Sequence, residues 1–216
     1  MKDLGQTLMM YGGEMAFSGK LNYHSKSMDG NGYTDLYDAR ITSDRFDFKQ
    51  TKYNSRNAKF ELNSTLSDNL ALATENVQVE VDMAAKLATF KSNLGDGRID
   101  FPENLYAAWV EQFSWKMVDK KLQFSSAKAT HMFANGKIVK PSPAQSQDLP
   151  KGSLFLSVHK GQDSLNWVSP VADFDLKTNT IAAHKVNLVA VADAHIFTAD
   201  GEVTIQPMAK MKTLTG

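Results

Sequence analysis

The sequence predicts an all-β protein: an elongated β-jellyroll or β-solenoid-like stack of mostly antiparallel strands, with at most one short helix. Two observations predict this fold. Apolar and polar residues alternate with a period of two through much of the chain, and short turns rich in glycine and asparagine separate the alternating runs. We therefore expect at least ~45% strand and less than ~12% helix, where an ordinary globular protein has ~20–25% strand.

The alternation in these runs has one physical explanation. Successive side chains of a strand point to opposite faces, so one face can meet a core while the other meets water. The runs are "RFDFKQ", "VQVEVDM", "FSWKM", "KLQF", "LFLSV" and "DFDL". A shift of one residue would turn each apolar set to solvent, so we expect the runs to share one inward-facing surface. It would comprise Phe46, Phe48, Val77, Val79, Val81, Phe113, Trp115, Leu122, Phe124, Leu154, Leu156, Phe174 and Leu176.

Four turns are predicted between these runs. They are "MDGNG" at 28–32, "SNLGDG" at 92–97, "FANGK" at 133–137 and "TADGE" at 198–202. Asn-Gly and Asp-Gly pairs tolerate the positive φ that tight hairpins need. The spacing of the turns is irregular, so the sequence predicts no repeat of fixed length.

Two segments depart from the strand pattern. Residues 100–112, "DFPENLYAAWVEQ", fit a short helix or a strand. The helix would have Leu105, Ala108, Trp109 and Gln112 at helical spacing, and the strand would carry Tyr106, Ala108 and Val110 on one side. Residues 140–152, "KPSPAQSQDLPKG", contain three prolines that block ladder hydrogen bonds. We expect a single elongated β domain over residues 1–216, with a soft subdomain boundary at 140–152.

Composition narrows the classes of function. The 24 basic and 24 acidic residues cancel, so the chain lacks the charge excess that favours nucleic acid. There is no cysteine, which removes disulfides and thiolate chemistry. No apolar stretch is long enough for a membrane-spanning helix. The first residues lack the apolar core of a signal peptide, and the last ones stop on a strand-like run, so we expect a fragment of a longer chain.

The sequence predicts no catalytic, cofactor-binding or metal-binding site. The five histidines lack metal-ligand spacing. "DGNGYTD" resembles the start of a calcium loop but lacks its later ligands, so a turn is the favoured interpretation. Asp173 and Asp175 are favoured as a solvated strand face rather than as catalytic carboxylates. Ser125 and Lys128 form an S-x-x-K by chance, since their context predicts a strand.

Several stretches carry a family resemblance. They include "LYDARITSDRFDF", "FKSNLGDGRIDFPENLYAAWVEQFSWKMVDKKLQF" and "VADFDLKTNTI". They resemble large Gram-negative cell-envelope proteins and, more distantly, the organic-solvent-tolerance (OstA-type) domains of periplasmic lipopolysaccharide transport. The resemblance implies a β-jellyroll with an apolar interior, no catalytic residues, and a location in the periplasm or at the outer membrane. The longer loops and the segment at 140–152 depart from the family pattern.

Three hypotheses of function follow. The first is a non-enzymatic structural or assembly module that joins other envelope proteins through edge strands. The second is a lipid or glycolipid carrier with an apolar groove. The third is a carbohydrate-binding β module that would use an exposed Trp109, Trp115 or Trp167. The candidate lining of a groove, or of a packed core, is Phe46, Phe48, Phe113, Trp115, Phe124, Leu154, Leu156 and Phe174.

Overall fold

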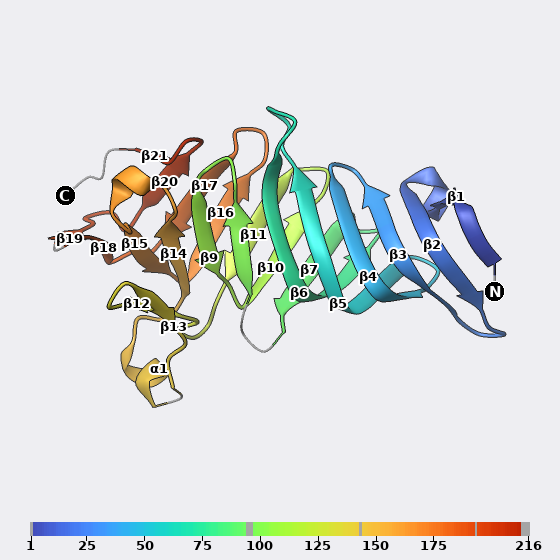
Figure 1. The fold of residues 1–216 in the computed structure, drawn as a ribbon, viewed down its shortest axis with the longest axis horizontal. Helices are drawn as coiled ribbons and strands as arrows, with labels where there is room; N and C mark the ends of the chain where they lie inside the picture. The colour runs from blue at the N-terminus through green and yellow to red at the C-terminus, as the bar shows by residue number, and fades with distance from the viewer. Residues whose placement is uncertain (1, 94–96, 143, 193, 213–216) are drawn as a thin grey trace.

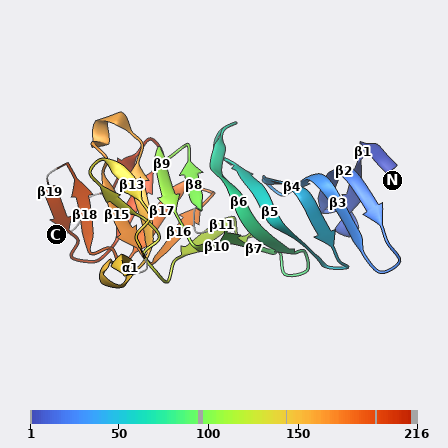
Figure 2. The ribbon, with the colours of Figure 1, turned by 60° about the horizontal axis from the view of Figure 1, so that its bottom comes forward.

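The protein is elongated and almost entirely β. The computed structural model describes residues 2–93, 97–142, 144–192 and 194–212, with side chains from Thr7 onward. Of the described residues, 61% lie in strands and 5% in helices, which confirms the predicted all-β class. Figures 1 and 2 show residues 2–10 and residues 194–197 near opposite ends of the long axis.

The chain begins as an antiparallel meander in which each strand pairs with the next. Its strands are β1 (Lys2–Met10), β2 (Met15–Tyr23), β3 (Met28–Leu36), β4 (Ala39–Phe48), β5 (Lys52–Asn63) and β6 (Leu70–Asp82), and the 3-10 helix η1 (Tyr11–Gly13) joins the first two. Strand β4 shows why these residues form a sheet: its apolar Ile41, Phe46 and Phe48 are buried while the charged residues between them reach solvent.

At β6 the sheet divides, because the C-terminal part of β6 pairs with β7 and its N-terminal part pairs with β8. The first branch consists of β7 (Leu87–Ser92), β10 (Gln112–Lys116), β11 (Lys121–Ser125), β16 (Val171–Asp175), β17 (Thr180–His184), β20 (Val203–Gln206) and β21 (Lys210–Met211). The second branch consists of β8 (Arg98–Phe101), β9 (Tyr106–Trp109), β14 (Ser153–Ser157), β15 (Asn166–Ser169), β18 (Leu188–Val191) and β19 (Ala194–Phe197).

The two branches face each other as the layers of a sandwich. The ring of Phe101 in β8 lies 5.6 Å from Phe124 in β11 and 5.5 Å from Phe174 in β16, measured between ring centroids. The chain crosses between the layers repeatedly, for example from β9 to β10 and from β15 to β16. The layers therefore belong to one folded sheet, which is the jellyroll-like arrangement that the sequence predicts.

A line of strand kinks, here called the crease, marks where the sheet folds over. In β2 and β3 it passes through Gly19 and Gly32, which lie opposite each other with φ of 149° and 143°. In β4 and β5 it passes through residues 44–46 and 55–57, where the ladder is interrupted. In β6 it reaches Asn76, whose φ is 58°. Bulges and glycines bend strands in this way, and here they are aligned across neighbouring strands.

Away from the crease, turns within or leading into the first branch contact turns of the N-terminal meander. Lys120 in the β10–β11 turn forms an ion pair of 3.0 Å with Asp38 in the β3–β4 turn. The Nδ2 of Asn179, in the β16–β17 turn, donates to Ser64 Oγ at 2.7 Å. Lys86 in the β6–β7 turn likewise pairs with Glu14. These contacts join the first branch to the meander.

The segment between β11 and β14 lies on the outside of the second branch. It holds the hairpin of β12 (Met132–Ala134) and β13 (Lys137–Val139) and the helix α1 (Gln145–Asp148); a further 3-10 helix, η2 (Lys160–Gln162), follows β14. Strand β9 before this segment pairs directly with β14 after it. The subdomain boundary at 140–152 stays a prediction.

The turn predictions have mixed outcomes. "FANGK" forms the β12–β13 turn, with φ of 51° at Asn135 and 72° at Gly136. "MDGNG" is instead the start of β3, paired on both sides, because its glycines serve a bend inside the strand rather than a hairpin. Part of "SNLGDG" lies outside the described residues. In residues 100–112, the strand interpretation is right: a turn precedes β9.

Candidate functional site

The predicted groove or core residues form the first candidate site. Six of the eight lie in one continuous apolar core between the layers, each at most 5% exposed: Phe46, Phe48, Phe113, Trp115, Phe124 and Phe174. The wider inward-facing set, Val77, Val79, Val81, Leu122 and Leu176, lies in the same core. The core extends along the molecule from Phe17 in β2 to Ile205 in β20.

Leu154 and Leu156 do not share this inward-facing surface. Leu154 lies in a separate outer cluster with Ala107 and Trp109, against which Leu156 packs. The residue between them, Phe155, points into the main core and stacks on Trp167 at 5.6 Å with an interplanar angle of 4°. Strand β14 is apolar on both faces because the β12–β13 hairpin covers its outside, so alternation alone could not assign its inner face.

Aromatic rings pack closely inside the main core. Phe90 and Phe113 stack with centroids 4.4 Å apart, and Phe60 lies 4.5 Å from Phe90. Such distances are those of rings in direct contact. The side chains of the two layers therefore fill the space between them around these residues.

Tyrosines at the N-terminal end of the core add hydrogen bonds to this packing. The hydroxyl of buried Tyr53 lies 3.1 Å from Thr34 Oγ1, and burial raises the pKa of Tyr53. Tyr11 donates to the carbonyls of Lys49 and Lys52, and burial raises the pKa of Tyr11 to about 12. Both phenols stay protonated at neutral pH and act as structural donors.

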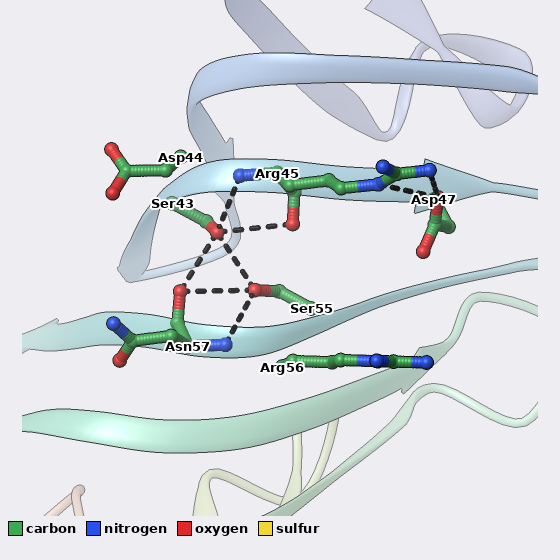
Figure 3. A pocket seen from close by; sticks show the side chains of 7 residues that line it. All are labelled: Ser43, Asp44, Arg45, Asp47, Ser55, Arg56 and Asn57. Carbon is green, nitrogen blue, oxygen red and sulfur yellow. Dashed lines mark hydrogen bonds and ion pairs between the residues drawn. The ribbon is translucent and has the colours of Figure 1, made fainter.

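The second candidate site is a hollow of about 310 Å³ at the crease, shown in Figure 3. Ser43 of β4 and Ser55 of β5 hydrogen-bond to each other at 2.7 Å. Ser43 Oγ accepts from the backbone N–H of Arg45 and lies 2.8 Å from the carbonyl of Asn57; Ser55 Oγ accepts from the N–H of Asn57. The hydroxyls thus replace ladder hydrogen bonds that the kink removes.

This geometry favours a structural role for the serines. Among the described residues, neither hydroxyl contacts a histidine or a carboxylate that could accept its proton, which a nucleophilic serine needs. The guanidinium groups of Arg45 and Arg56 run in the same direction along their strands (Figure 3), and Arg45 is paired with Asp47 at 3.2 Å. The hollow is lined by charges of both signs.

The carboxylates of Asp173 and Asp175, which the sequence singles out, are also held in structural contacts. Asp173 accepts from Gln123 and lies 3.0 Å from His184, which lies 2.7 Å from Glu202 on its other ring nitrogen. Asp175 instead accepts from the backbone N–H of Lys177. Within the described ranges, no group of three or more histidine and carboxylate side chains is placed to hold a metal ion.

The former calcium-loop candidate is part of a strand. Asp29 in β3 accepts a hydrogen bond of 2.9 Å from Asn22 and lies 2.9 Å from His24. The hydrogen bond from Asn22, followed by that from His24, holds the pKa of Asp29 below its ordinary value. The carboxylate of Asp29 therefore joins β2, the following turn and β3.

The third candidate site is formed by the outermost strands. Among the described residues, strand β1 pairs only with β2, and β19 pairs only with β18. All four residues of β19 are exposed, and the exposed fraction of the Phe197 side chain reaches 74%. Phe197 lies opposite Leu188 of β18. The sequence predicts no site in "AHIF", because a short apolar strand has the same pattern whether it is buried or at an edge.

The three tryptophans are buried. Trp115 and Trp167 are at most 1% exposed in the main core, and Trp109 is 9% exposed in the outer cluster, between Arg98 and His131. None presents an open ring face of the kind that stacks on a sugar, and this counts against the carbohydrate-binding hypothesis.

Comparisons with protein-family models and with curated proteins find no match for this chain. Among the described residues, no helix is long and apolar enough to span a membrane.

Proposed function

We propose that this chain is a non-enzymatic structural or assembly module of a cell-envelope protein, located in the periplasm or at the outer membrane, that joins its neighbours through the free edges of its sheet. The observation that carries the proposal is the placement of those edges. The sheet ends in β1 at one end of the long axis, its second branch ends in β19 near the other end (Figure 1), and its first branch ends in β21. Unpaired edge strands are templates for pairing with another chain.

The packed interior supports a structural role. Apolar side chains fill the space between the layers from β2 to β20, and the aromatic rings among them approach to 4.4 Å between centroids. The hydroxyls of Ser43 and Ser55 at the crease hydrogen-bond to backbone groups and to each other. The resemblance to envelope proteins supports the location.

Cysteine pairing between two copies tests the proposal, since the natural chain has no cysteine. Thr7 of β1 and His195 of β19 are exposed edge positions. We expect Thr7→Cys mixed with His195→Cys to form a disulfide-linked dimer under mild oxidation, and Ser114→Cys, on the outer face of β10, to form none with either. Adding Phe197→Pro to the His195→Cys chain should abolish the dimer, because the N–H of Phe197 points away from β18 and proline removes this edge donor. No dimer, or equal dimer with Ser114→Cys, would contradict assembly through the edges.

A lipid or glycolipid carrier remains the second candidate. One observation favours it: the main core is apolar without interruption along the molecule. A carrier would have to displace the aromatic side chains that fill this space, so the two candidates differ in how much stability those side chains provide.

A further inference from the structure

The second branch is apolar on its outer face as well as on its inner face. The β12–β13 hairpin covers one part of this outer face through Phe133 and Ile138. No described residue covers the part over β15 and β18, which is hollowed to about 450 Å³. Its wall includes Val168 of β15 and Leu188 of β18. By contrast, the outer face of the first branch carries polar Thr89, Ser114 and Gln123 in one cross-strand row.

Two lysines and two prolines line one end of this hollow. Lys151 and Lys185 are exposed, and neither forms an ion pair with a described residue. Pro150 and Pro170 lie at the same end. Lys185 has a φ of 57° where β17 ends, and Lys151 directly precedes β14. The lysines therefore lie where the chain crosses between the layers, and the apolar wall runs away from them along β15 and β18.

We propose that this hollow binds a small anionic amphiphile, with its carboxylate or phosphate group at Lys151 and Lys185 and its apolar body against Val168 and Leu188. Size and chemistry support this ligand class: small-molecule sites are concave, ~300–1,000 Å³ in volume, and mostly apolar with a few charged groups that fix orientation. Charge also argues against a second copy as the occupant. Two such faces packed about a two-fold axis would bring four unpaired lysines together.

The site lies outside the core, so it is independent of the edge-strand assembly and of any lipid held between the layers. A ligand at this site would leave the side chains of Phe48 and Phe124 in place. A ligand between the layers would have to displace them.

Titration calorimetry with laurate below its micelle concentration tests the proposal. We expect saturable binding to the wild-type chain at one site. Reversing both lysines in Lys151→Glu/Lys185→Glu should weaken it by about tenfold or more, since two charge-assisted contacts become repulsive. The matched control Lys116→Glu/Lys121→Glu makes the same change in net charge on the outer face of the first branch and should leave the affinity unchanged. Dodecyltrimethylammonium, with the same chain and a positive head, should bind more weakly than laurate.

A second variant separates this hollow from the core. Leu188→Asp should abolish laurate binding, while circular dichroism and the melting temperature show that the chain is folded. Val118→Asp, in the exposed β10–β11 turn away from the hollow, provides the matched apolar-to-acid control. Absence of laurate binding to the wild type, equal weakening by the control lysine pair, or laurate binding that survives Leu188→Asp in a folded chain would each overturn the proposal.

Discussion

Ser43 and Ser55 show how single side chains can hold a bend in a sheet. Their hydroxyls satisfy backbone groups of Arg45 and Asn57 where the β4–β5 ladder is interrupted. The same solution recurs at Ser169, whose hydroxyl lies 2.7 Å from the carbonyls of Val171 and His184 where β15 crosses to β16. Serine suits this role because it is small and can both donate and accept.

Removing one crease serine should destabilise the fold without unfolding it. Ser43→Ala leaves buried backbone groups without partners, and we expect the free energy of unfolding to fall by about 1–3 kcal/mol. Ser114→Ala, on the outer face of β10, should change it by less than ~0.5 kcal/mol. Urea titration measures both. Equal effects of the two substitutions would show that the serine bridge contributes nothing to the bend.

The lowered pKa values of two carboxyl groups predict how the stability of the protein changes in acid. The hydrogen bond from the Ala85 backbone N–H, followed by the hydrogen bond from Lys52, holds the pKa of Asp82 below its ordinary value, as Asn22 does for Asp29. A carboxyl group with a lowered pKa in the folded state stabilises the protein above its unfolded pKa of ~3.9, and this stabilisation is lost as pH falls through the folded pKa.

The stability of the wild type should therefore fall steeply below about pH 4, and Asp29→Asn/Asp82→Asn should flatten this part of the profile. Melting temperatures between pH 2 and pH 7 measure it. Asp119→Asn, at an exposed turn position without a hydrogen bond to a described residue, is the control. An unchanged acid limb in the double variant would contradict the assignment of these two carboxylates.

At the scale of elements, the crease depends on a close approach between β2 and β3. A Cβ at Gly32 would lie 2.1 Å from the carbonyl oxygen of Ser18, and one at Gly19 would lie 2.0 Å from that of Asn31. Only glycine permits this contact, and both residues have positive φ. This is why "DGNG" lies inside a strand although its composition is typical of a turn.

Gly32→Ala should cost more than about 3 kcal/mol of unfolding free energy, because backbone must move to admit the methyl group. Gly136→Ala is the matched control. It has a similarly unfavourable φ of 72° but open space around its Cβ, so only the conformational cost of about 1–2 kcal/mol applies. Similar losses at the two glycines would mean that the β2–β3 approach is not required for the fold.

The sequence predicts where the strands lie better than it predicts which face of each strand is buried. The alternation in "RFDFKQ" and "FSWKM" identifies strands and their buried sides, because one side of those strands meets water. In "LFLSV" both sides are apolar, so the pattern predicts the strand but not that Phe155 points inward. The division of β6 between β7 and β8 leaves no local signal, since it depends on residues far apart in the sequence pairing across a kink.

At the scale of the whole molecule, the candidate sites differ in how far the sequence predicts them. The main core follows from alternation. The free edge of β19 and the hollow beside Leu188 do not, because an apolar residue at an edge or on an outer face has the same sequence signature as a buried one. Both depend on the order of strands in the sheet, which only the folded chain defines.

Side chains fill the interior between the layers, and the proposed structural role depends on this packing. The unfolding free energies of Phe48→Ala and Phe124→Ala test it most directly, with Phe197→Ala as an exposed control. Phe48 and Phe124 are at most 5% exposed, whereas Phe197 is 74% exposed. We expect each core substitution to cost roughly 3–5 kcal/mol and Phe197→Ala to cost much less, with no lipid in mass spectra of extracts of the purified wild type. Small losses at both core positions, together with co-purified lipid, would contradict the account and favour a carrier.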